Sequence, residues 1–209
     1  TNVDMSSVNL DGLIKAENMF DSTGVTEVDL SWLPKAKDLK YINEMFVNCG
    51  NLINISWPES LSVLPSLQSA DRMFSCCTSI ETVSIPQLLL PNLETTDYMF
   101  YSCSNLSEIT IKDGLVAPKL TSVSYMISGA SLERVDLENI LINRNGMNFQ
   151  GFLENNEVIE SFTLQNEIYA QNIADMFIGC SNIKQIDLRN MFMEKMSTED
   201  QFIDFLEGC

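Results

Sequence analysis

The chain has 209 residues, with 29 Asp or Glu against 12 Lys or Arg, so its formal net charge is −17, and it has no histidine. This acidic balance excludes nucleic acid and an anionic membrane surface as expected partners, because phosphates require clustered Lys and Arg. No apolar run approaches the ~18 residues of a membrane-spanning helix, so we expect no membrane insertion by this segment. An acidic surface suits a basic partner, but its commoner meaning is solubility.

A short box of the form Met-Phe-x-x-Cys recurs along the chain. A near-fixed period of this length is typical of a solenoid, in which each coil buries its apolar face only against its neighbours. We therefore expect one continuous domain over residues 1–209, with about seven complete repeats of 25–28 residues. The boxes begin at Met19, Met45, Met73, Met99, Met126, Gly151 and Met176, at steps of 26, 28, 26, 27, 25 and 25 residues.

Each box leads into an apolar triplet whose last two members are two residues apart, so that they point to the same side of a strand. A further triplet ahead of the first box brings the expected strands to eight. The triplets are Met5/Val8/Leu10, Val25/Val28/Leu30, Leu52/Ile55/Trp57, Ile80/Val83/Ile85, Leu106/Ile109/Ile111, Leu132/Val135/Leu137, Ile159/Phe162/Leu164 and Ile183/Ile186/Leu188.

The arms between each strand and the next box carry prolines and an apolar position six residues before the Met. We interpret the arms as the outer wall of each coil, with at most a helical turn before the Met-Phe pair. The leucines are Leu13, Leu39, Leu67, Leu93 and Leu120, and the prolines are Pro34, Pro65, Pro91 and Pro118.

Segments such as Asp97–Ile111 (DYMFYSCSNLSEITI) and Ala174–Leu188 (ADMFIGCSNIKQIDL) resemble the BspA-type leucine-rich repeats. The likeness covers about residues 5–209. It implies an α/β-type solenoid, a right-handed stack with a parallel β-sheet on one face and short helical or irregular arms on the other. It also implies a cell-surface or secreted protein associated with adhesion. The chain departs from the pattern where Thr23, Ala130 and Asn155 take the place of the Cys, and no Asn ladder follows the strands.

Four of the six cysteines, Cys49, Cys77, Cys103 and Cys180, share one position in the repeat. Stacked side chains in such a column point the same way into the core, where a free Cys behaves as a small hydrophobe. We therefore expect structural, reduced thiols, although a strained bridge between neighbouring coils stays open. Without histidine or convergent ligands we expect no metal site and no cofactor.

Trp32 and the C-terminal segment leave alternatives open. Trp57 falls in the inward row and is expected in the core, whereas Trp32 lies beyond its triplet, where a core role and an exposed aromatic contact are equally open. The segment after Ser197 fits a capped helix. It also fits a truncated or capping eighth repeat near residues 197–209, which places Cys209 in the Cys column.

The outward strand positions form two polar columns, which are either a solvated sheet face or a shallow recognition surface. No histidine base, phosphate loop or nucleophile motif accompanies them, so we expect no enzyme. The candidate binding face comprises Glu27, Asp29, Ser56, Ser84, Glu108, Thr110, Arg134, Asp136, Thr163, Gln185 and Asp187.

Two functions fit this pattern. The first is a non-catalytic binding or adhesion module that recognises a protein or carbohydrate ligand through the outward strand face. The alternative is a structural spacer or assembly repeat of a larger surface, fibre or virion protein, with end-to-end self-association through its coil ends.

Overall fold

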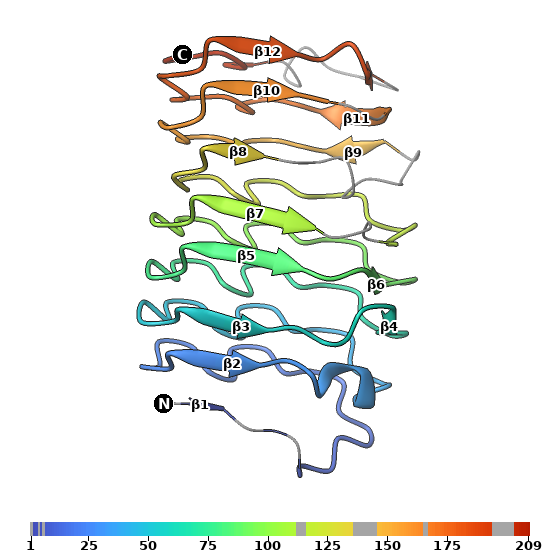
Figure 1. Ribbon diagram of the computed structural model, residues 1–209. Coiled ribbons are helices and arrows are strands. Elements are labelled where there is room, and N and C mark those ends of the chain that lie inside the picture. Colours follow the sequence, from blue (N-terminus) through green and yellow to red (C-terminus); the bar gives the residue numbers. More distant parts are fainter. Residues whose placement is uncertain are drawn as a thin grey trace.

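In the computed structural model the chain forms a β-solenoid, with parallel strands stacked coil upon coil from the N-terminal to the C-terminal end (Figure 1). The structure describes residues 2–3, 5, 7–111, 116–135, 146–164, 167–193 and 203–209. The expected leucine-rich-repeat-like stack is confirmed. Its main face carries, among these residues, the strands β1 (Asn2–Val3), β2 (Glu27–Asp29), β3 (Asn54–Ser56), β5 (Thr82–Ile85), β7 (Glu108–Ile111), β8 (Arg134–Val135), β10 (Ser161–Thr163) and β12 (Gln185–Asp187).

The arms are built from short strands and turns more than from helix. Across the described ranges the helical content is one 3-10 turn, Leu33–Lys35, with Pro34 in its first turn. The remaining strands lie on the arms: β4 (Ser62–Val63), β6 (Leu88–Leu89), β9 (Met147–Asn148), β11 (Ile168–Asn172) and β13 (Met191–Met193). A third line of parallel bridges runs beside the boxes through Lys15, Tyr41, Ser69, Thr95, Ser122 and Asn148.

The main-face strands pair in register, so the inward and outward rows stay aligned from coil to coil. Val83 pairs with Ile109 and Ser84 with Thr110, and along β5 exposed and buried residues alternate. The described residues of the apolar triplets accordingly face the core in the interior coils, whereas Leu137 lies outside the described part of the chain. Side chains that face the core therefore alternate with side chains that face solvent along each strand, as the sequence predicts.

The first expected triplet, Met5/Val8/Leu10, is wrong as a strand. The strand lies earlier, because Val3 pairs with Val28, and Val8 is 48% exposed. A backbone hydrogen bond from Val8 N to Met5 O (3.2 Å) closes a turn there. Since Met5 follows Val3 by two residues, it takes the place that Leu30 has in the next coil.

Along the box, backbone N–H groups that donate to the next coil alternate with N–H groups that close local turns. The N–H groups of Tyr98, Phe100 and Ser102 donate to carbonyls of the following coil, each at 2.8 Å, whereas the N–H groups of Tyr101 and Cys103 donate three residues back. This alternation requires two left-handed residues per box, here Tyr98 (φ 57°) and Ser102 (φ 55°). Such residues cost of order 1–3 kcal/mol each, which the hydrogen bonds between coils offset.

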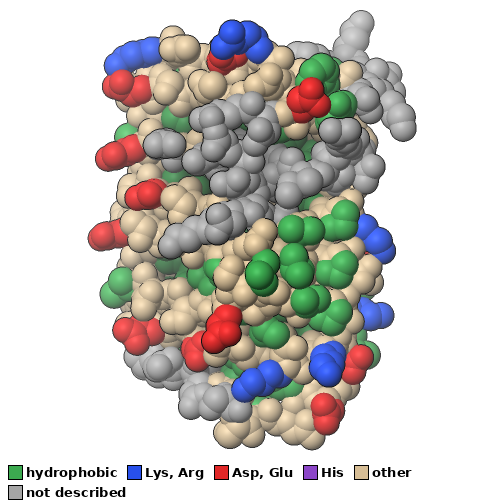
Figure 2. Space-filling view, turned by 45° about the vertical axis from the view of Figure 1, so that its right-hand side comes forward, with side chains coloured by type: hydrophobic (Ala, Val, Ile, Leu, Met, Phe, Trp, Pro, Cys, Tyr) green, Lys and Arg blue, Asp and Glu red, His purple; other side chains and the backbone are tan. Residues whose placement is uncertain are grey.

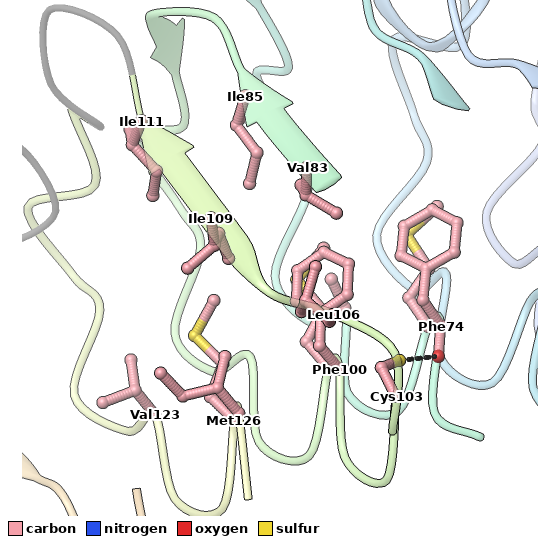
Figure 3. Packing of buried hydrophobic residues seen from close by; sticks show 14 of the residues in the cluster. Phe74, Val83, Ile85, Phe100, Cys103, Leu106, Ile109, Ile111, Val123 and Met126 are labelled. Atoms are coloured by element: carbon pink, nitrogen blue, oxygen red, sulfur yellow. Dashed lines mark hydrogen bonds between the residues drawn. The ribbon is translucent and has the colours of Figure 1, made fainter. Parts of the chain in front are cut away.

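The phenylalanines of successive boxes stack into a ladder inside the solenoid. The rings of Phe20, Phe46, Phe74 and Phe100 have centroids 5.1, 5.5 and 5.5 Å apart and planes within 10° of parallel. Figure 3 shows Phe74 and Phe100 beneath the inward residues of β5 and β7. The prediction that the Met-Phe box is core is confirmed in the interior coils, while Met19 in the first coil is 43% exposed.

The cysteine column is held by hydrogen bonds from thiols to backbone carbonyls of the preceding coil. Cys103 Sγ donates to Phe74 O at 3.2 Å (Figure 3). Equivalent bonds join Cys49 to Phe20 O, Cys77 to Phe46 O, Cys180 to Leu153 O and Cys209 to Phe177 O, at 3.1, 3.2, 3.2 and 3.0 Å. All six cysteines are free thiols, so the structural interpretation of the column is confirmed.

In the box after Gly151 the expected register is wrong by one residue. Gly151 (φ 58°) and Asn155 (φ 57°) are the two left-handed residues, so Phe152 takes the Met place and Asn156, not Asn155, takes the Cys place. Asn156 is fully buried, and its Nδ2 donates to Ile127 O and Leu153 O, both at 2.9 Å. The pair Gly151-Phe152 resembles Met-Phe in sequence, so the predicted box begins one residue too early.

Trp32 is 3% exposed, so of its two alternatives the core role is correct and the exposed aromatic contact is wrong. Trp57 is partly buried and packs its ring edge-on against Phe74, with centroids 5.9 Å apart. Asp204–Cys209 repeats the box of the preceding coil, since Asp175 N and Gly179 N donate to Ile203 O and Glu207 O. The proposed helix cap at Ser197 lies outside the described residues.

Candidate functional site

The outward strand residues lie in two aligned columns, as the sequence predicts. Strand pairing places Glu108 opposite Arg134 and Thr82, and Gln185 opposite Ser161. The second column pairs Asp29 with Ser56, Ser84 with Thr110, and Thr163 with Asp187. Glu27, Ser56, Ser84, Glu108, Thr163 and Gln185 are exposed, and Asp29, Thr110 and Asp187 are half-buried. Asp136 and the side chain of Arg134 lie outside the described part of the chain.

Two aspartates of these columns have local structural partners. Asp29 Oδ1 accepts a hydrogen bond from Ser31 N at 2.8 Å. Asp187 Oδ1 accepts one from Arg189 N at 3.1 Å, and its carboxylate pairs with the Arg189 guanidinium at 2.6 Å. These hydrogen bonds from Arg189 lower the pKa of Asp187. Arg189 is a cation that the sequence analysis missed, although it follows Asp187 by only two residues.

A polar ladder runs along the bridges beside the boxes. Asn43 Oδ1 accepts from Ser69 Oγ (2.6 Å), Asp71 Oδ1 accepts from Thr95 Oγ1 (2.7 Å), and Asp97 Oδ1 accepts from Ser122 Oγ (2.6 Å). Each acceptor also receives a backbone N–H of the following coil, at 3.1, 2.9 and 2.7 Å. Burial raises the pKa of Asp97, although its hydrogen bonds oppose this. The sequence predicts no Asn ladder after the main-face strands. The polar ladder described here runs beside the boxes, on another side of the solenoid.

The first left-handed positions of successive boxes form a second line of contacts on the surface. Arg72 lies 3.9 Å from Glu44 and covers the Tyr98 ring, 4.2 Å from its centroid. Tyr98 stacks on Tyr125 with centroids 4.9 Å apart, and Tyr125 Oη donates to Asp175 Oδ2 at 3.2 Å. Tyr101 packs edge-on against Tyr98. This line could not be predicted from the sequence, because its residues share no single type.

Hydrophobic side chains gather on another face of the stack. Figure 2 shows them toward its right-hand side, with acidic side chains along its left margin. Leu61 and Val63 are 58% and 44% exposed on the arm that carries β4, and Leu89 and Val116 beside them are half-buried.

Residues 14–151 match the BspA type leucine rich repeat region in six copies. The chain belongs to this family. No curated protein and no solved structure matches it. BspA-type repeats usually occur in surface proteins, and repeat solenoids of this kind are typically non-catalytic.

Three properties of the described residues bear on the chemistry that the BspA-type solenoid can perform. Within them, no three Cys, Asp or Glu side chains converge in a way that could hold a metal ion. The same ranges contain no helix long and apolar enough to cross a membrane. Burial raises the pKa of the Cys103 thiol to about 12, so this thiol stays protonated and is a poor nucleophile at neutral pH.

Proposed function

We propose that this BspA-type solenoid is a non-catalytic binding module of a cell-surface or secreted protein, that its role is adhesion, and that it recognises protein or glycan through its outward strand face. The observation that carries the proposal is the pair of aligned side-chain columns, most of whose described members are exposed, on a continuous core. Strands in a sheet are ~4.8 Å apart, so a ligand meets groups that are already ordered and loses less entropy on binding.

The chemistry of the columns favours hydroxyl-rich or basic ligands. Ser84 and Thr163 carry hydroxyls that both donate and accept, Gln185 carries an amide, and Glu27 and Glu108 are acceptors. These side chains are exposed. A protein of net charge −17 repels anions and attracts cationic partners. Sugars and basic peptides are therefore the ligand classes that fit.

The test is binding of the full chain to panels of glycans and of basic peptides, before and after charge reversal on the face. The face variant is Glu27→Lys with Glu108→Lys, which avoids Asp29 and Asp187 because these hold turns. The matched control is Glu59→Lys with Glu94→Lys, which makes the same change in charge at exposed arm positions.

We expect ligands selected by the native chain to bind the face variant at least about tenfold more weakly, or ~1.4 kcal/mol, and to bind the control as before. Both variants must show the native circular dichroism spectrum and thermal midpoint. If the two variants bind equally, or if only the control loses affinity, the strand face is not the binding surface.

A further inference from the structure

A cavity of about 60 Å³ lies in the interior of the solenoid, between the main-face strands and the boxes. Ile85 and Ile111 line it from the strands β5 and β7. Met126 lines it from the opposite side of the coil, and Figure 3 shows its side chain directed towards these strands. All three side chains are buried, so the cavity belongs to the core and not to the surface.

Small side chains at one position of the repeat leave room for the cavity. The position lies three residues before the Met of each box and directly after the line of bridges beside the boxes. Two of the coils that line the cavity carry Ile42 and Val123 at this position. The two coils between them carry the smaller Ala70 and Thr96, which also line it. Because protein interiors are otherwise closely packed, this difference in side-chain size widens the interior at the middle coils.

The surface that the described residues present to the cavity is almost wholly apolar. The hydroxyl of Thr96 already has a partner, since its Oγ1 donates to Met126 Sδ at 3.6 Å. A water molecule in a cavity needs two to four polar partners, and these walls do not provide them. An apolar molecule needs no such partners, and it gains dispersion contacts with every wall that it touches. The chemistry of the walls therefore selects apolar ligands.

The wall on the arm side is a single layer of chain that is apolar on both of its faces. Leu88 and Leu90 line the cavity, whereas Leu89 between them is half-buried on the outer side. Val63 pairs with Leu89 and is 44% exposed. The strands of this wall, β4 and β6, have only two residues each. An aliphatic group that approaches from the arms therefore meets apolar side chains on both sides of a thin wall.

We propose that this cavity binds a small aliphatic group of two or three carbon atoms. An apolar cavity of about 150 Å³ holds benzene, with its six carbon atoms, so a volume of about 60 Å³ suits a ligand less than half that size. Met73, Met99 and Met126 line one side, and the flexible methionine side chain adjusts its shape to a ligand. The cavity lies inside the coils and the strand columns lie outside, so either proposal stands if the other fails.

The experiment follows the methyl resonances of the full chain, labelled with ¹³C at the methionine methyl groups, while propane is dissolved in increasing amounts. Met73, Met99 and Met126 line the cavity, whereas Met147 and Met176 are also buried but do not line it. We expect saturable shifts at the first three methyl groups and none at the other two. Ethanol, which is close to propane in size but carries a hydroxyl, is titrated in parallel and should give no saturable shift.

Ala70→Ile introduces the side chain that Ile42 has one coil earlier, and it should weaken propane binding about tenfold or more because it fills the cavity. Ala16→Ile, at the same repeat position but outside the cavity, is the matched control and should bind propane as the native chain does. Ala70→Val fills less space and should bind with intermediate affinity, and it decides the test if Ala70→Ile changes the circular dichroism spectrum. Equal shifts at all five methyl groups, equal affinity for ethanol, or native affinity in the Ala70 variants would overturn the site.

Discussion

Replacing Phe100 with alanine removes a fully buried ring from the ladder that runs through the coils. Phe100 is 0% exposed and stacks on Phe74 at 5.5 Å. A phenylalanine buries on the order of 150–250 Å², which at ~25 cal/mol per Å² corresponds to roughly 4–6 kcal/mol as an upper value. Measured Phe→Ala substitutions in cores cost about 3–5 kcal/mol, and we expect a loss of unfolding free energy in this range.

Phe20→Ala is the matched control, since Phe20 has the same box position in the first coil. It is only partly buried and stacks on Phe46 at 5.1 Å. We expect a loss of about 1–2 kcal/mol, because a half-exposed ring leaves a smaller cavity. Equilibrium unfolding in urea, followed by circular dichroism, measures both losses. The comparison holds if the dependence of the unfolding free energy on urea concentration, the m value, is the same in both variants and the native chain. A loss below ~1 kcal/mol for Phe100→Ala, or equal losses in both variants, would refute the ladder as core.

Asn156→Leu leaves the carbonyl of Ile127 without its donor and removes one of the donors to Leu153 O, so it should cost about 2–4 kcal/mol in urea unfolding, whereas Asn156→Cys keeps one donor and should cost less; the reverse order would contradict the corrected register. Burial raises the pKa values of Cys103 and Cys180 to about 12, whereas unfolded thiols ionise near pH ~8.5. The unfolded chain therefore binds fewer protons in this window, and stability should fall by ~1.4 kcal/mol per pH unit for each thiol as the pH rises from about 8.5 to about 12. Urea midpoints at about pH 8 and about pH 10 measure this loss of stability. If the double variant with Cys103→Ala and Cys180→Ala loses as much stability over this range as the native chain, these thiols are not the cause. Gly151→Ala should displace Tyr125 and lower the thermal midpoint, and a native midpoint would count against the close approach of the ring.

The strand face was predictable because its pattern is local. Alternation of Val83, Ser84 and Ile85 specifies which side chains face the core, and a repeat of nearly constant length then aligns them across coils. The core role of Phe100 and Cys103 follows from the same repetition, since a position that is apolar in most coils must face the shared interior.

The register errors have a different physical origin. The box is defined by two left-handed residues, and these are Tyr98 and Ser102 in one coil but Gly151 and Asn155 in another, so residue type does not reveal them. Asn156 replaces a cysteine because its amide donates to the same kind of carbonyl, an equivalence of hydrogen bonding that an apolar pattern does not show.

The contacts of Tyr125 could not be predicted from the sequence because they join residues far apart in the chain. Tyr125 meets Asp175 across 50 residues, and it does so because Gly151 has no side chain between them. Trp32 was ambiguous because it follows the strand, where the chain turns into a 3-10 segment that buries it.

The register of the strands decides which side chains a partner can reach, and thiol labelling of two neighbouring positions tests it most directly. Val83 is buried and Ser84 is exposed on β5. Under native conditions Ser84→Cys should react with a maleimide at least about a hundredfold faster than Val83→Cys, which corresponds to ~3 kcal/mol of local opening. Peptide mapping separates the new thiols from the six natural ones. Equal rates, or faster labelling of Val83→Cys, would contradict the register and with it the proposed binding face.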